Sequence, residues 1–519
     1  MELIKKNIHM NKIKCKTTMQ MTLDDDVNVP DIKPDIEKIV KEQAIVKITD
    51  YKILNERLMI EGVLEFGILY ISSEDGRLVH CINGKIPFED VVNMDNAHSE
   101  DMIKIRYYLD DLTATMVNSR KISVRAIVSF ECIAENVYDE ETVVDIICDE
   151  KEGVESVHKN ILVTQIAVNK KDTYRVKEEI ILPSSKQNVM EILYSDVALQ
   201  AFDTRVMEGN ISIKGELLMF VMYTSENGDT EYLEKEIPFS GNIDVEGCQS
   251  DMIDDISTIM TARDICVKAD TDGEERVLEL EVVLAMDIKL YCEDELQIVK
   301  DFYAIGRNVR PVISQGFYDN VLMKNNSKLR LVDRVRIEDN EPAVLQLCNS
   351  MSVARIDDCR MADNALMVEG VLEISLMYIT NDDRLPVNSV SSIIPFNQAI
   401  EVKGINQDCI YSVRPAVENC SVIMTDAREL EVKASLAMDS IVFERRMEDI
   451  IKDYEEVIEE EENKSGNNMA MVGYVVKRNE CLWDLAKRYH TTRECIKVTN
   501  FLEGEEIKEG DRLLIIRQG

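Results

Sequence analysis

The sequence predicts a mainly β protein, with three tandem β-rich repeat domains that each carry a short helix, followed by a small C-terminal domain of strands and helices. Three observations support this fold class. One motif returns twice at a nearly constant spacing along the 519 residues. Within each copy, apolar residues alternate at period two, which is typical of strands. The last 46 residues, from Tyr474 to Gly519, instead hold a helical apolar stripe.

The repeated motif predicts the domain organisation. Each copy carries a glycine as its fourth residue, and these glycines are Gly62, Gly215 and Gly370. Their spacings of 153 and 155 residues indicate tandem domains rather than a short-period solenoid. A unit of this length can bury its own core. The predicted limits are residues 1–150, 151–310 and 311–454 for the repeats, 455–471 for an acidic linker and 472–519 for the C-terminal domain.

Three anchors predict strands within each repeat. The first is the glycine motif itself, where alternate residues share one face of a strand, and its glycine suggests a bulge or a close backbone approach. The second is an Ile-Pro-Phe triplet at residues 86–88, 237–239 and 394–396. The third is an alternating apolar run that starts at Ile122, Leu278 and Leu430.

A short helix is predicted before the first anchor of each repeat. In the first copy, Ile36, Ile39 and Val40 fall on one helical face, and Pro34 stands early in the first turn. The corresponding segments are residues 188–193 and 343–347.

Charge and cysteine usage restrict the partners and the compartment. The net charge is −38, and because residues 472–519 carry +1, the rest of the chain carries −39. Such a body is repelled by phosphate backbones and anionic lipid, so we expect no nucleic-acid partner, although solubility alone could explain part of the acidity. No stretch has the roughly 20 apolar residues of a membrane span, and the N-terminus lacks a signal-peptide pattern. The 13 cysteines are scattered, which also favours a cytosolic location.

No pattern for catalysis, metal binding or cofactor binding is found. The five histidines do not pair at zinc-ligand spacing, and no phosphate-binding glycine loop or nucleophile motif occurs. Acidic pairs such as Asp110-Asp111 are expected by chance among 98 acids, and we interpret them as solvated surface. We therefore expect a protein that is not an enzyme and uses no cofactor or metal.

The C-terminal stripe predicts two helices. Leu482, Leu485, Ala486 and Tyr489 share one core-facing side of the first helix. Trp483, the only tryptophan in the chain, lies beside this stripe. A half-exposed tryptophan is a typical interface anchor, although it could equally fold over the edge of its own small core. Residues 491–494 match a capping box that opens the second helix.

Two resemblances follow from these residues. The order Tyr474, Leu482, Trp483, Ala486, Tyr489, Asn500, Gly510, Leu513 resembles a LysM module, a small β-α-α-β domain that binds ligands and does no chemistry. The triplicated body resembles the SPOCS domain of endospore-forming bacteria. Together they resemble the SipL-like spore-coat morphogenetic proteins. The loop before the first helix departs from the glycan-reading LysM pattern, because Asn479-Glu480-Cys481 replaces Gly-Asp-Thr.

The resemblance implies a non-enzymatic scaffold of spore envelope assembly. Such proteins act in the mother-cell cytoplasm at the forespore surface, and they bind the SpoIVA-type coat morphogenetic ATPase through the LysM module. The residues that we expect to contact this partner are Trp483, Leu482, Met471, Lys487, Arg488 and Arg493. The repeats could supply further coat contacts. The acidic linker predicts a tether that lets the module move semi-independently. The alternative is a LysM protein that binds peptidoglycan or cortex glycan.

Overall fold

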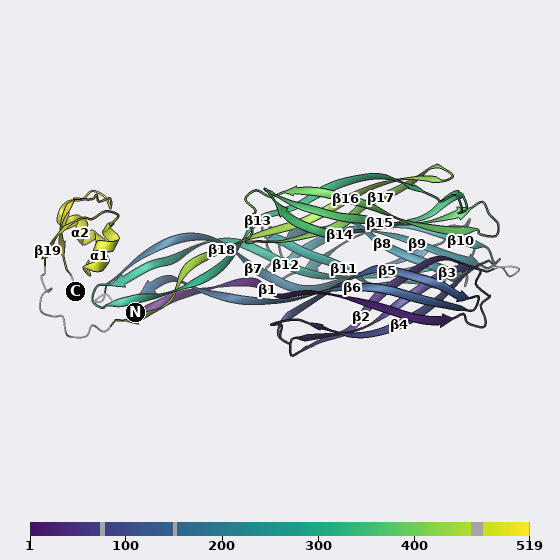
Figure 1. Cartoon of the computed structure of the whole chain (residues 1–519), viewed down its shortest axis with the longest axis horizontal. Coiled ribbons are helices and arrows are strands. Elements are labelled where there is room, and N and C mark those ends of the chain that lie inside the picture. The colour runs from purple at the N-terminus through teal and green to yellow at the C-terminus, as the bar shows by residue number, and fades with distance from the viewer. Residues whose placement is uncertain (73–77, 149–152, 458–470, 518–519) are drawn as a thin grey trace.

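The computed structural model describes residues 1–72, 78–148, 153–457 and 471–517, and these are mainly β (Figure 1). Each repeat forms two antiparallel three-stranded sheets from six strands. Repeat 1 holds β1 (Glu2–Asn28), β2 (Lys38–Leu54), β3 (Arg57–Ile71), β4 (Val79–Asn93), β5 (Met102–Asn118) and β6 (Lys121–Ile147). Repeat 2 holds β7 (Val154–Ile181), β8 (Val189–Met207), β9 (Asn210–Ser225), β10 (Thr230–Asp244), β11 (Ile253–Ala269) and β12 (Glu275–Ala304). Repeat 3 holds β13 (Val309–Arg336), β14 (Val344–Ala362), β15 (Ala365–Thr380), β16 (Val387–Glu401), β17 (Cys409–Asp426) and β18 (Glu429–Glu456).

Two of the predicted anchors face each other across one strand pair. The glycine motif forms the central strand of its sheet, and the Ile-Pro-Phe triplet lies on the neighbouring edge strand, where proline is tolerated. Gly62 stands opposite Phe88, and Gly215 and Gly370 stand opposite the equivalent phenylalanines. A Cβ atom on Gly62 would lie 2.4 Å from Cζ of Phe88. The same Cβ atom would lie 2.7 Å from the backbone oxygen of Lys47, so the predicted close backbone approach is confirmed, and the Phe88 ring crowds the position further.

The predicted short helices are wrong. Lys38 to Val40 belong to β2, and residues 189–193 and 344–347 belong to β8 and β14. Each of these strand starts contains a register shift, as between Ile39 and Lys41. A β-bulge places two successive residues out of alternation, so a bulged strand imitates the i, i+3, i+4 spacing of a helix. The segments are also too short to stabilise a helix alone.

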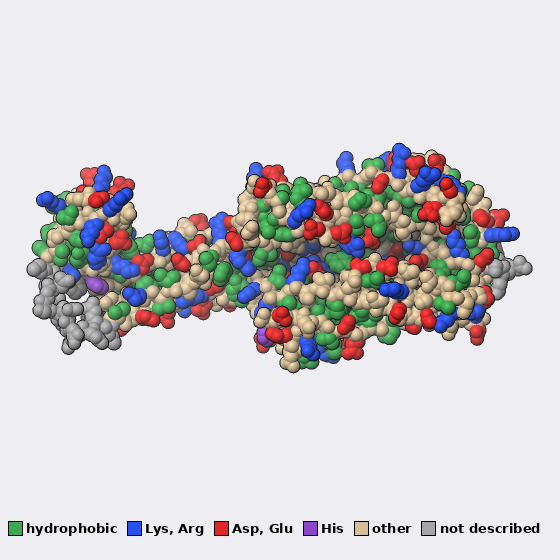
Figure 2. Space-filling view, viewed as in Figure 1, with side chains coloured by type: hydrophobic (Ala, Val, Ile, Leu, Met, Phe, Trp, Pro, Cys, Tyr) green, Lys and Arg blue, Asp and Glu red, His purple; other side chains and the backbone are tan. Residues whose placement is uncertain are grey.

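The three repeats pack around a shared centre. One hydrophobic cluster takes residues from all of them, including Val40, Leu193, Phe220, Met351 and Met377, so no repeat encloses all of its apolar surface alone. Acidic and basic side chains are interspersed over the visible face of the body (Figure 2).

The first and last strands of each repeat run beyond the body as a stalk (Figure 1). The stalk is made by the pairs β1–β6, β7–β12 and β13–β18. Its interior is mainly apolar, with Ile8, Val163, Ile298 and Ile450 in one cluster and Phe302 in a second cluster nearer the tip. The stalk was not predicted from the sequence.

The C-terminal domain contains β19 (Met471–Val475), α1 (Leu482–Arg488), α2 (Arg493–Asn500) and β20 (Arg512–Ile516). Strands β19 and β20 pair antiparallel. The domain lies beside the free end of the stalk (Figure 1). Residues 458–470 of the predicted linker lie outside the described residues, whereas Glu455 and Glu456 belong to β18 and Met471 to β19. In the described ranges, the helices fall short of the length and apolarity that a membrane span requires.

Candidate partner-binding face of the C-terminal domain

The stripe of α1 forms the core of the C-terminal domain. Leu482, Leu485 and Ala486 are buried together with Ile496 of α2 and Leu513 of β20. Leu482, which we expected to contact a partner, is only 1% exposed and therefore supports the site from inside. Tyr489 packs partly against this core and meets the ring of Tyr474 edge-on, with 5.8 Å between ring centroids.

Trp483 is half-buried against the tip of the stalk. Its indole Nε1 donates a hydrogen bond to Oδ2 of Asp301 in β12 at 2.8 Å. Its ring meets the ring of Tyr303 edge-on at 5.0 Å between centroids. Tyr303 is 2% exposed and joins the core of the C-terminal domain, and its hydroxyl donates to the carbonyl of Thr491 at 2.7 Å. Burial raises the pKa of this hydroxyl, so it stays a donor. The tryptophan therefore anchors an interface within the chain.

Two of the predicted cationic contacts lie on the same face. Lys487 places Nζ 2.6 Å and 2.7 Å from the two carboxylate oxygens of Asp301. Arg493 lies over the ring of Trp483, 5.3 Å from its centroid, and reaches Glu155 of β7 at 3.4 Å. We call Trp483, Lys487 and Arg493 the Trp483 face.

Arg488 and Met471 lie apart from the Trp483 face. The Arg488 guanidinium donates to the Tyr474 hydroxyl at 3.0 Å and to Glu480 at 2.9 Å, so it braces the loop before α1. Met471 opens β19 opposite Ile516 and is 57% exposed. Both are therefore outside the group that meets the stalk.

Glu480 fills the loop that departs from the glycan-reading pattern. Its carboxylate accepts hydrogen bonds from the Lys477 amide at 2.9 Å, from the Tyr474 hydroxyl at 2.8 Å and from Arg488. These donors, the Lys477 amide first, lower the pKa of Glu480 to about 2. Asn479 adopts a left-handed conformation with φ of 63°, a backbone for which glycine is the usual residue.

Two further motif positions, Asn500 and Gly510, shape the connection between α2 and the last strand. The Asn500 side chain donates to the carbonyl of Leu514 at 2.8 Å and accepts from the Leu514 amide at 2.7 Å, so it ties α2 to β20. Gly510 has φ of 92° in the turn before β20. The predicted capping box at residues 491–494 is wrong, because Thr492 rather than Thr491 is the N-cap and Cys495 rather than Glu494 stands at the third helical position. The Thr492 hydroxyl still caps the helix, accepting from the Cys495 amide at 3.0 Å.

The stalk half of this interface, namely Asp301, Tyr303 and Glu155, was not predicted from the sequence. Asp301 has structural equivalents in the other two repeats. Asp145 and Asp453 occupy the same position, because all three follow a register shift and accept a hydrogen bond from the next backbone amide. Residues two positions beyond the equivalent aspartates are Ile147 and Glu455, so Tyr303 is particular to repeat 2.

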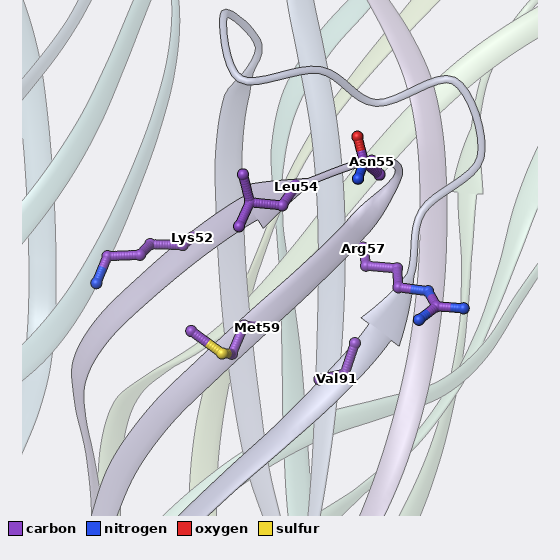
Figure 3. A pocket seen from close by; sticks show the side chains of 6 residues that line it. All are labelled: Lys52, Leu54, Asn55, Arg57, Met59 and Val91. Carbon is purple, nitrogen blue, oxygen red and sulfur yellow. The ribbon is translucent and has the colours of Figure 1, made fainter.

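Two open hollows in the described part of the chain lie away from the Trp483 face. An open hollow of about 440 Å³ lies at the β2–β3 hairpin, and its lining side chains come from that hairpin and β4 (Figure 3). A second, of about 340 Å³, lies against β19 and β20 beside Asn500. Across the residues that the structure describes, no group of three or more histidine, cysteine, aspartate or glutamate side chains could hold a metal ion.

Comparison with known proteins identifies the repeats. Residues 35–117, 188–268 and 343–425 each match the family described as SipL, SPOCS domain. Each match covers about four strands, from β2 to β5 in repeat 1, and leaves most of the stalk outside. No curated protein and no solved structure matches the chain. The three SPOCS matches support a SipL-like family for this chain, and this family suggests a sporulation-related role.

Proposed function

We propose that this chain is a non-enzymatic scaffold of spore envelope assembly. Its C-terminal domain, which resembles a LysM module, binds a SpoIVA-type coat morphogenetic ATPase. The chain thereby helps to tether the coat to the forespore surface from the mother-cell cytoplasm. The SPOCS matches support the sporulation context.

The observation that carries the binding proposal is the Trp483 face. It combines a large indole with two cations, and such a combination of aromatic and arginine side chains is typical of interface hot spots. The same face already holds an acidic and aromatic surface of repeat 2. A surface that makes such contacts within the chain has the chemistry to make them with a partner.

Replacing Trp483 by glutamate tests this proposal. We expect the W483E variant to lose capture of the SpoIVA-type ATPase in a pull-down, because the charge would stand where the indole packs and would face Asp301. The matched control is Phe501→Glu, since Phe501 is 92% exposed and lies outside the Trp483 face. Full capture by W483E, or loss of capture by the control alone, would contradict the assignment.

The alternative function is binding of peptidoglycan or cortex glycan. The open hollow beside Gly473, Val475 and Asn500 is the feature that favours it. Glu480 disfavours glycan binding. Its side chain fills the loop before α1, and the resemblance to LysM modules implies that sugar would approach the backbone there. Titration of the protein with peptidoglycan fragments tests this alternative, and tight binding would favour it over the scaffold.

A further inference from the structure

The tip of the stalk presents one compact recognition surface to the C-terminal domain. Asp301 accepts hydrogen bonds from Trp483 and from Lys487, and Tyr303 supplies both a ring contact and a hydroxyl donor. Glu155 pairs with Arg493 at the edge. The surface is therefore a carboxylate beside an aromatic ring, with a second carboxylate at its rim. We call these three residues the stalk tip.

The stalk tip belongs to repeat 2 alone, although all three repeats end in the same bulged geometry. Repeat 1 has Glu2 opposite Ile147, so it keeps an acid in the place of Glu155 but lacks the aromatic ring of Tyr303. Repeat 3 places Arg310 opposite Glu455, and an arginine there would repel the cations of the Trp483 face. Only β7 and β12 combine Glu155, Asp301 and Tyr303. The contact thus follows from specific side chains that the other repeats lack.

The contact covers the residues that the proposed function needs. Trp483, Lys487 and Arg493 all meet the stalk tip, and His490 Nδ1 also lies 3.3 Å from the carbonyl of Ala304. An external partner cannot contact these atoms while repeat 2 holds them.

We propose that the Trp483 face recognises surfaces that combine a carboxylate with an aromatic ring, and that the stalk tip occupies this face until a partner of the same chemistry displaces it. This inference rests on the proposed function. The partner binds only the undocked form, so its apparent dissociation constant is raised by the inverse of the undocked fraction. The stalk tip acts as an internal competitor, and its residues indicate what the partner presents.

The test uses the full chain and its single tryptophan. Asp301→Lys places a cation against Lys487 and removes the acceptor of the indole, so we expect tryptophan emission to move to longer wavelength as Trp483 meets water. Asp145→Lys is the matched control, because Asp145 has the same bulge and the same backbone hydrogen bond but, among the residues that the structure describes, no hydrogen bond or ion pair with the C-terminal domain. Its emission should equal that of the wild type.

The same variants are then titrated with the SpoIVA-type ATPase. If the undocked form is roughly 0.1–10% populated, D301K should bind about ten- to a thousandfold more tightly than the wild type, and the control should not differ. Unchanged emission of D301K overturns the docked contact, and shifted emission with equal or weaker binding overturns the competition. Absence of binding by every variant contradicts the proposed function and with it the competition. In that case the emission shift of D301K still shows whether the docked contact exists. A failure of the docked contact can therefore be distinguished from a failure of the proposed function.

Discussion

At the scale of single residues, the three repeated glycines are explained by the rings that cross them. The rings of Phe88, Phe239 and Phe396 lie over Gly62, Gly215 and Gly370. Each ring occupies the space that a side chain at the glycine would need. The crowding is greatest at Gly370, where an added Cβ would lie 2.2 Å from the carbonyl oxygen of Arg355 and 2.7 Å from Cζ of Phe396. The glycine motif and the Ile-Pro-Phe triplet thus form one cross-strand pair of glycine and phenylalanine, which occurs in all three repeats.

Gly370→Ala should destabilise the protein, because both the backbone of β14 and the Phe396 ring must move to admit a methyl group. We expect a loss of about 1–3 kcal/mol, seen as a lower Tm in thermal unfolding. Gly504→Ala is the control, since a Cβ atom there would have no neighbour within 4 Å. Equal Tm values for the two variants would show that the ring contact does not constrain this position.

At the scale of elements, alternation predicted the strands well and bulges caused the errors. The period-two pattern from Ile60 to Tyr70 and the run from Ile122 both lie in strands, because a strand with one buried face must alternate. Near Ile39 the sequence pattern predicts a helix where β2 holds a bulge, since a bulge and a short helix place the same residues on one face. The 27–30-residue strands of the stalk could not be predicted, because their outer halves are buried only by the other repeats.

The loop before α1 predicts a pH dependence of the C-terminal domain. Folding lowers the pKa of Glu480 from 4.5 to about 2, chiefly through the Lys477 amide. A lowered folded pKa stabilises the fold above the unfolded value, and this contribution is lost as pH falls through the folded value. Glu480→Gln should therefore lower the Tm near pH 7, and its difference from the wild type should shrink between about pH 4.5 and pH 2.

Melts followed by Trp483 emission measure this effect locally, because the chain has one tryptophan. The exposed Glu503 provides the control variant, Glu503→Gln. A pH-independent difference between E480Q and the wild type would show that the carboxylate charge contributes nothing and that only packing was changed.

At the scale of the whole molecule, the repeats are joined through buried charge as well as apolar surface. Lys289 of repeat 2 pairs with Glu135 of repeat 1 at 2.5 Å, and both side chains are almost fully buried. Arg414 of repeat 3 pairs with Asp255 of repeat 2 at 2.5 Å and with Asp439 at 2.7 Å. No sequence pattern within one repeat identifies the partners Glu135 and Asp255, because the Lys289–Glu135 and Arg414–Asp255 pairs cross a boundary between repeats. The same holds for the stalk tip and the Trp483 face.

The buried Lys289–Glu135 pair, which joins repeat 2 to repeat 1, should stabilise the body against unfolding. Lys289→Met leaves Glu135 buried near Lys104 alone, at 3.2 Å, and we expect a loss of about 3–5 kcal/mol. Arg336→Met is the matched control, because its pair with Asp339 is exposed and should contribute less than about 1 kcal/mol. Chemical denaturation followed by circular dichroism measures both. Since salt screens buried charges weakly, the loss in K289M should persist at high ionic strength. A K289M loss that salt abolishes, or one no larger than that of the control, would mean that the buried Lys289–Glu135 pair does not stabilise the body.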